Sequence, residues 1–245
     1  MTIRLIQNLQ QLSHLGAIAV KTEFEAEGAT FEEVRILKEI TDVVGFDFVL
    51  KISGCEAIRD LKDAKALGIK NIVAPMIESK YAFKKFINST SKTIPDAKLF
   101  INIETINGLS ELDKILQANE AEKLSGIVFG RSDFAGSLDI TDVEDKKIIS
   151  AIKEISKKAY LHKKWFVIGG GITEQTLKTI KQIDFLPSVE TRKIVFDASK
   201  LNEEGIRKAL EFEINWLEYK QKFSYSPDDA FRLQILSNRL ANKLN

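Results

Sequence analysis

The sequence predicts an α/β protein, a closed TIM-type (β/α)8 barrel with additional C-terminal helices. Two observations favour this fold class: short, almost uninterrupted apolar runs recur along the chain, and segments with helical spacing of apolar residues separate them. Continuous apolar runs are typical of strands covered on both faces, and strands that alternate with helices form parallel sheets. A length of 245 residues suits one such barrel. An open doubly wound sheet is the alternative, but no Gly-x-Gly-x-x-Gly turn follows the first strand.

Seven strands are expected from the apolar runs, and an eighth is placed less firmly. The eighth is expected at residues 2–6 or 185–189, where Pro187 weakens a central-strand interpretation. Between the strands, residues such as Val34, Leu37 and Ile40 have helical spacing, and Gly45 suits the end of that helix. The seven expected strands cover residues 17–20, 46–50, 71–74, 99–103, 126–129, 165–168 and 194–196.

The pattern changes after Ala198. A long helix is expected from residue 203 to about 223 and a second from 228 to about 242, with a break that contains Pro227. One apolar stripe can close the barrel, whereas the other either packs back on the same chain or contacts another subunit. We therefore expect a catalytic barrel domain at residues 1–200, followed by helices at 201–245 that close the barrel or mediate oligomer contacts.

The composition indicates an ordinary soluble globular protein. Hydrophobic residues make up 44% of the chain and charged residues 29%, and 36 basic against 35 acidic side chains leave a net charge of +1. Such a balance lacks the basic excess that attracts nucleic acid. No apolar run reaches the roughly 20 residues that cross a membrane, and the first residues lack the apolar middle of a secretion signal. We expect no nucleic-acid or membrane partner and a cytoplasmic location.

Few residues are available for thiolate or imidazole chemistry. Cys55 is the only cysteine and is interpreted as a packing residue. His14 and His162 are the only histidines, and neither lies beside another plausible catalytic group in the sequence. A metal in this protein must therefore be held mainly by oxygen.

Two acidic residues follow neighbouring strands of the expected barrel. Glu104 and Asp133 each come after an apolar run and before a helical segment, so both should emerge at the active-site edge of the sheet. Carboxylates there suit Mg²⁺ or Mn²⁺, which can leave positions open for a bidentate 2-oxo acid. Isolated acids at strand ends also cap helices or pair with Lys and Arg, and this alternative remains open.

Further side chains are expected at the same mouth. By strand alternation Glu23 and Lys51 face it from the first and second strands. The backbone amides from Gly130 to Asp133 suit an anionic carboxylate if they form a nest. The glycines at 169–171 are interpreted mainly as a tight connection into the next helix.

These segments resemble the HpcH/HpaI aldolase and citrate lyase beta-chain family over about residues 20–196. The resemblance implies a phosphoenolpyruvate-binding type of TIM barrel that makes or breaks bonds next to a pyruvate, oxaloacetate or acyl-CoA enolate. It implies metal ligation by Glu104 and Asp133, contact of the substrate carboxylate with the backbone of Gly130, Arg131 and Ser132, and a homo-oligomer built through the trailing helices. The matching motifs are Lys21-Thr22-Glu23-Phe24-Glu25, Leu50-Lys51-Ile52, Ala74-Pro75-Met76-Ile77-Glu78-Ser79, Ile103-Glu104-Thr105 and Phe129-Gly130-Arg131-Ser132-Asp133.

Two positions depart from the family pattern. Glu23-Phe24 stands where the pyruvate aldolases carry an acid–His pair, and Lys51 stands where they carry an arginine. Lysine keeps the charge but lacks the planar two-pronged geometry of arginine. We therefore expect a divergent subgroup in which Lys51 stabilises an oxyanion and Glu23 handles a proton directly or through water. For this task Glu23 needs a raised pKa.

The expected function is a divalent-metal-dependent carbon–carbon lyase or aldolase with Mg²⁺ or Mn²⁺ as cofactor. Its substrate is expected to be a 2-oxo acid or related acyl compound, with the Arg131 side chain contacting a second anionic group. A non-catalytic relative that binds an anion or a partner through the same barrel is the alternative. Transfer of a phosphoryl or acyl group ranks lower, because no Walker loop is present.

Overall fold

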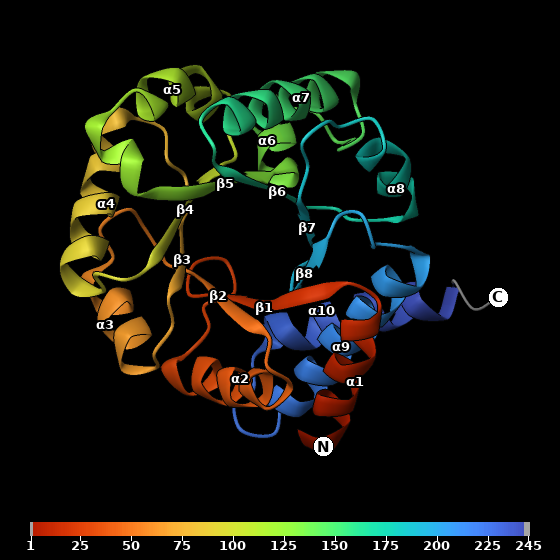
Figure 1. Ribbon diagram of the computed structural model, residues 1–245. Helices are drawn as coiled ribbons and strands as arrows, with labels where there is room; N and C mark the ends of the chain where they lie inside the picture. Colours follow the sequence, from red (N-terminus) through yellow and green to blue (C-terminus); the bar gives the residue numbers. More distant parts are fainter. Residues whose placement is uncertain (1, 243–245) are drawn as a thin grey trace.

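The protein folds into a closed eight-stranded barrel surrounded by helices, as the sequence predicts (Figure 1). The computed structural model describes residues 2–242. Each strand pairs with the next in sequence order, and β8 returns to pair with β1. The strands are β1 (Ala17–Glu23), β2 (Asp47–Lys51), β3 (Asn71–Ala74), β4 (Lys98–Ile103), β5 (Leu124–Gly130), β6 (Trp165–Gly169), β7 (Ser188–Glu190) and β8 (Ile194–Asp197).

The last strand differs from the expected parallel arrangement. Strands β1 to β7 pair in parallel, whereas β8 runs antiparallel to both β7 and β1. A connection of only residues 191–193 separates β7 from β8. Such a short loop joins antiparallel strands, because a parallel crossover needs a dozen or more residues. The mouth of the barrel therefore carries a hairpin between the last two strands.

Helices cover the outside of the barrel. Residues 2–6, one of the two places considered for the eighth strand, lie in a helix, because Leu5, Leu9 and Leu12 have helical spacing and bury one stripe. The eighth strand comes instead from the other place, around β7. The helices are α1 (Thr2–His14), α2 (Phe31–Val44), α3 (Ile58–Ala66), α4 (Lys80–Thr93), α5 (Ile106–Leu116), the 3-10 helix η1 (Asn119–Lys123), α6 (Arg131–Gly136), α7 (Lys146–Leu161), α8 (Glu174–Ile180), α9 (Glu203–Lys220) and α10 (Pro227–Asn242).

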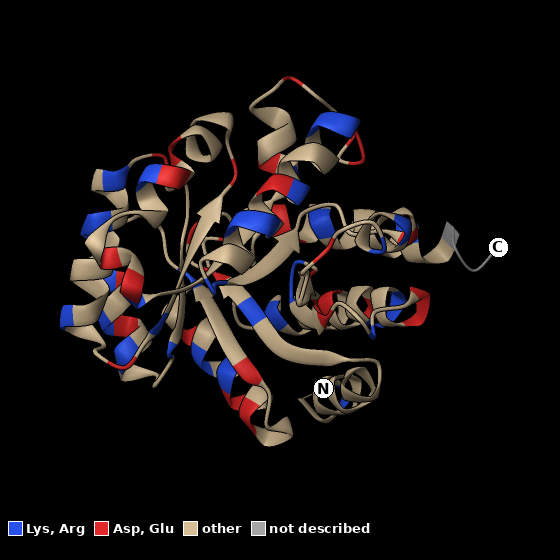
Figure 2. Cartoon of the chain, turned by 45° about the horizontal axis from the view of Figure 1, so that its top comes forward, with Lys and Arg blue, Asp and Glu red and all other residues tan. Residues whose placement is uncertain are grey.

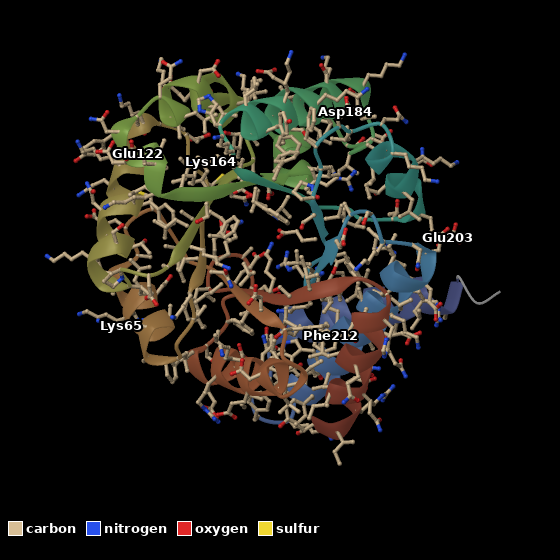
Figure 3. All side chains as sticks on the ribbon, in the orientation of Figure 1. Lys65, Glu122, Lys164, Asp184, Glu203 and Phe212 are labelled. Carbon is tan, nitrogen blue, oxygen red and sulfur yellow. The ribbon has the colours of Figure 1, made fainter. Side chains whose placement is uncertain are left out.

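Two apolar regions hold the barrel together. The larger core lies between the sheet and the helices, and Phe212 of α9, labelled in Figure 3, is fully buried in it. A smaller cluster inside the barrel contains Val73, Val128 and Val167, with Phe100 packed against it. The apolar interior lies below the strand ends, so the polar side chains above it form the floor of a pocket.

The C-terminal helices pack on the same chain beside β1 and β8 (Figure 1). Helix α9 contacts α1, and α10 packs on α9 through Leu236 against Ile214 and Leu217. Phe231 and Ile235 of α10 remain 66% and 49% exposed, so part of the predicted second stripe is not covered by the described residues.

Charged residues of both signs are spread over the outer helices (Figure 2). In this view blue and red segments alternate along the helices, in agreement with the balanced composition. Within residues 2–242, no helix combines the length and the apolar character that crossing a membrane requires.

Candidate active site

A pocket of about 470 Å³ lies at the carboxyl ends of the barrel strands. Its floor is built from the last residues of five strands: Glu23, Lys51, Gly130, Gly169 and Glu190. Asn102, Glu104 and Asp133 line it as well. The predicted site residues Glu23, Lys51, Glu104, Gly130, Ser132 and Asp133 therefore all meet in one cavity, as expected for the active-site face of a barrel.

Glu104 lies directly after β4 and is almost completely buried. Its Oε1 accepts the backbone N–H of Met76 at 2.9 Å, and its Oε2 accepts from the side-chain amide of Asn102. Burial raises the pKa of Glu104; Lys51 and the Met76 amide oppose this, whereas the carboxylates of Asp133 and Glu25 add to it. Asp133 itself is exposed on α6. Two carboxylates thus share a region where negative charge is only partly compensated.

Lys51 is buried between two carboxylates. Its Nζ lies 2.7 Å from Oε2 of Glu25 and 3.4 Å from Oε2 of Glu104. Burial alone lowers the pKa of Lys51, but attraction to Glu104 and Glu23 outweighs it and the pKa is raised. Lys51 is therefore a fixed positive charge beside Glu104. This position is compatible with the predicted role of Lys51, which is to stabilise an oxyanion of the substrate.

Glu23 has a pKa shift opposite to the one that a proton relay requires. Its Oε1 lies 3.1 Å from Nζ of Lys21, and both side chains are buried. Burial by itself raises the pKa of Glu23, but Lys21, Arg192 and Lys51 lower it to about 2. A carboxylate held this firmly in its ionised form is a weak base near neutral pH. The structure therefore does not support Glu23 as the proton-transfer group.

Lys21 and Glu190 are floor residues that the sequence interpretation missed. Lys21 forms a buried ion pair with Glu190 of β7, in addition to its contact with Glu23. Attraction to both acids outweighs burial, which alone lowers the pKa of Lys21, so that its pKa is raised. Strand alternation places Lys21 on the same side as Glu23, which was the available signal. Its partner was hidden because Pro187 made the strand around residue 188 doubtful.

The Lys21–Glu23 ion pair predicts a distinct acid sensitivity. Because the pKa of Glu23 is lowered from 4.5 to about 2, its contribution to stability is complete above pH 4.5 and is lost as the pH falls toward 2. Glu23→Gln is expected to be less stable at neutral pH and to lose less further stability on acidification. Urea denaturation of both proteins at about pH 7 and about pH 3.5 measures this difference. Equal losses in the two proteins would show that the pair contributes nothing.

The Arg131 side chain points away from the pocket and is fully buried. Its Nε and Nη2 donate to the carbonyl of Gly170 at 2.9 and 2.7 Å, and its Nη1 donates to Glu144 at 2.8 Å. Thr176 accepts a further bond from Nη2 at 3.1 Å. The predicted contact between this side chain and a second anionic group is therefore not supported. The guanidinium instead ties the 169–171 loop to the first turn of α6.

Two glycines permit close approach in the pocket wall. A Cβ atom on Gly130 would lie 2.9 Å from Oε2 of Glu104, and one on Gly170 would lie 2.7 Å from the backbone nitrogen of Ser132. Gly170 also has φ +83°, which favours glycine. The 169–171 loop leads into α8 at Glu174, as the plainer interpretation of this segment predicts.

Gly130→Ala is expected to displace the Glu104 carboxylate and to weaken Mn²⁺ binding about 10- to 100-fold, comparable to the loss of a supporting contact at a metal site. The matched control is Gly136→Ala at the end of α6, the helix that follows Gly130, since an added Cβ there meets no atom within 4 Å. Titration calorimetry with Mn²⁺ compares the variants. Unchanged affinity in Gly130→Ala would show that Glu104 does not need its present position.

The pocket contains oxygen donors of the kind that a hard dication requires. Within residues 2–242, no three His, Cys, Asp or Glu side chains form a ready metal cluster. However, the side-chain oxygen of Asn102 is buried and lacks a hydrogen-bond partner in the described residues, and it lies beside Glu104 in the same cavity. Two carboxylates plus one unpartnered amide oxygen fit Mg²⁺ or Mn²⁺ if substrate and water complete the coordination.

Comparison with known proteins is consistent with this architecture. The fold matches a HpcH/HpaI aldolase/citrate lyase family protein from Burkholderia cenocepacia J2315 over 84% of this chain and 89% of that chain, with 12% identity and a TM-score of 0.62. Citrate synthase SbnG covers 91% of both chains at 16% identity and a TM-score of 0.60. A HpcH/HpaI aldolase from Desulfitobacterium hafniense DCB-2 covers 85% of this chain and 86% of that chain at 11% identity and a TM-score of 0.59. At these identities the likeness establishes the fold.

The sequence is similar to the same family over part of its length. No curated protein matches the chain significantly. Residues 49–165 match the HpcH/HpaI aldolase/citrate lyase family, a segment shorter than the resemblance predicted over residues 20–196. It contains Lys51, Glu104 and Asp133 but not Glu23. The matched segment makes up 117 of the 245 residues and lies inside a closed barrel whose fold is shared with solved proteins of that family, so this chain is similar to the HpcH/HpaI aldolase/citrate lyase family in both sequence and fold.

Proposed function

We propose that this protein is a divalent-metal-dependent carbon–carbon lyase of the aldolase type that acts on a 2-oxo acid or related acyl compound. The observation that carries the proposal is the meeting of Glu104, Asp133 and the unpartnered oxygen of Asn102 in one pocket. These three side chains would hold Mg²⁺ or Mn²⁺. Such an ion supplies Lewis-acid stabilisation of the negative charge that develops on the substrate when a carbon–carbon bond breaks.

The chain's own residues provide positioning and charge. Lys51 is held beside Glu104 and places a permanent positive charge next to the developing oxyanion. The backbone of Gly130, Arg131 and Ser132 would bind the substrate carboxylate, and Arg131 fixes the position of this segment against Gly170. Glu23 does not relay a proton in this proposal. It stays ionised and balances the positive charge of Lys21 in the floor of the pocket.

Hydrogen exchange into pyruvate tests the proposal. In deuterated water containing Mn²⁺, the protein is expected to replace the methyl protons of pyruvate, a reaction followed by the loss of the methyl signal in proton NMR. Chelation with EDTA should stop the exchange, and re-addition of Mn²⁺ should restore it. Absence of exchange with pyruvate and with several other oxo acids would contradict the lyase proposal.

A non-catalytic anion-binding relative is the second candidate. The observations that favour it are the lowered pKa of Glu23 and the engagement of Lys51 by Glu25 and Glu104, which leave no evident base among the predicted catalytic residues. Binding of oxalate in the presence of Mn²⁺ without any exchange into oxo acids would support this candidate.

We also propose that the protein forms a homo-oligomer, since Phe231 and Ile235 leave an apolar face on α10. Light scattering measures the number of subunits.

A further inference from the structure

The pocket has two zones of different chemistry. The deep zone at the strand ends contains carboxylates and two lysines, including Glu104 and Lys51. The outer zone is formed by α9, α10 and the loops after β6 and β7, and it combines apolar side chains such as Leu210 and Leu236 with arginines. The arginines of this outer zone are Arg192, Arg207, Arg232 and Arg239.

Three of the four arginines already have carboxylate partners. Arg192 lies 3.0 Å from Glu27, and Arg232 lies 2.6 Å from Glu213. Arg207 pairs with Glu211 one turn along α9. Their positive charges are therefore largely compensated inside the protein, and none of the three needs a ligand.

Arg239 has no such partner within residues 2–242. The half-buried side chain makes one hydrogen bond, from Nη2 to the carbonyl of Ile172 at 3.3 Å. A guanidinium carries five N–H donors and stays charged at all physiological pH values. A cation that lines a pocket with most of its donors unused favours an anionic ligand over any neutral one.

Arg239 lies at the end of a continuous wall that begins at the proposed metal ligands. Gly130, the last residue of β5, is in close contact with Glu104. Ser132 lies two residues further along the chain, on α6. Gly170 packs on Ser132, and Ile172, two residues further, accepts the bond from Arg239. A ligand whose head group lies at Glu104 can therefore extend along this wall and reach the guanidinium. The apolar side chains of Leu210 and Leu236 line the same outer zone and suit a short methylene chain.

We propose that Arg239 is a specificity-determining residue that binds a second anionic group of the substrate, remote from the oxo-acid head. This inference rests on the proposed function and narrows the substrate class to 2-oxo acids or acyl compounds that carry a distal carboxylate or phosphate. The contact with a second anionic group, which the sequence analysis expects from the Arg131 side chain, is thereby made by Arg239 of α10.

Titration calorimetry with Mn²⁺-loaded protein tests this subsite. The paired probes are 2-oxoglutarate and 2-oxopentanoate, which have the same chain length and differ in the distal carboxylate. Oxalate reports on the head-group site alone. We expect 2-oxoglutarate to bind at least about tenfold more tightly than 2-oxopentanoate, since its distal carboxylate can accept charge-assisted hydrogen bonds from Arg239. Arg239→Gln should remove this preference and leave the oxalate affinity unchanged.

Asn238→Ala, an exposed neighbour on the same helix, is the control variant and should keep the preference. A phosphonate analogue of 2-oxoglutarate that binds more tightly still, and depends on Arg239 in the same way, would assign the distal group as phosphate. Equal binding of the paired probes, or a preference that survives Arg239→Gln, would refute the role of Arg239. Failure of oxalate to bind the unaltered protein would instead contradict the proposed function.

Discussion

Replacing Glu104 with alanine is expected to reduce Mn²⁺-dependent exchange into pyruvate by more than about 100-fold, because loss of a ligand exceeds the 10- to 100-fold effect of losing a supporting contact. Glu104 is the buried member of the proposed ligand set and contacts both Asn102 and the Met76 amide. Asp133→Ala should have a similar effect, since the two carboxylates line the same cavity.

A second substitution at Glu104, to glutamine, should lower activity without lowering stability. Burial disfavours the charged form of Glu104, so Glu104→Gln should keep or increase the melting temperature of the metal-free protein while abolishing exchange. Glu39→Gln, at an exposed glutamate that pairs with Arg35 on α2, is the control for both measurements. Exchange at the normal rate in Glu104→Ala would refute the assignment of this residue. Loss of exchange accompanied by unfolding would leave Glu104→Gln as the deciding variant.

Replacing Arg131 with glutamine is expected to lower the free energy of unfolding by about 3–5 kcal/mol, the usual cost of removing one partner of a buried ion pair. The guanidinium is fully buried and is bonded to Glu144, Gly170 and Thr176. Its loss leaves the Glu144 carboxylate, whose side chain is 11% exposed, without its cation.

Urea denaturation measures this loss, with Arg35→Gln as a matched control. Arg35 also contacts two carboxylates, Glu32 and Glu39, but it does so at the surface, where ion pairs contribute less than about 1 kcal/mol. Arg131→Lys should fall between the two, since lysine keeps the charge and loses the two-pronged bond to Gly170. An effect of Arg131→Gln as small as that of Arg35→Gln would show that the buried network does not hold the loop.

The barrel was largely predictable because strands covered on both faces have a simple signature. Runs such as 99–103 and 126–129 are almost entirely apolar, and the structure places β4 and β5 there. Residues 2–6 are apolar enough to resemble a strand, and only the spacing of Leu5, Leu9 and Leu12 over a longer stretch identifies helix α1. The reversed direction of β8 does not follow from apolar runs, which contain no information on orientation.

The site was predictable where strand alternation decides the direction of a side chain. Glu23, Lys51 and Glu104 all reach the pocket in this way. Alternation fails at Arg131, because α6 begins at this residue and turns its side chain away from the cavity. It also gives no pKa. Burial alone raises the pKa of Glu23, and the lowering comes from Lys21, its neighbour on β1, together with Arg192 and Lys51, which reach Glu23 only through the fold.

The closure of the barrel by β8 also bears on how the chain reaches its native state. Strand β1 pairs with β2 on one side and with β8 on the other, and in the pairing with β8 Ala17 lies opposite Phe196. This closing contact spans most of the polypeptide, so loop-closure entropy must be overcome before it forms. During synthesis on the ribosome, the sheet stays open between β7 and β1 until β8 has emerged. A nascent chain that ends before β8 therefore exposes two unpaired strand edges, a situation in which chaperones protect against aggregation.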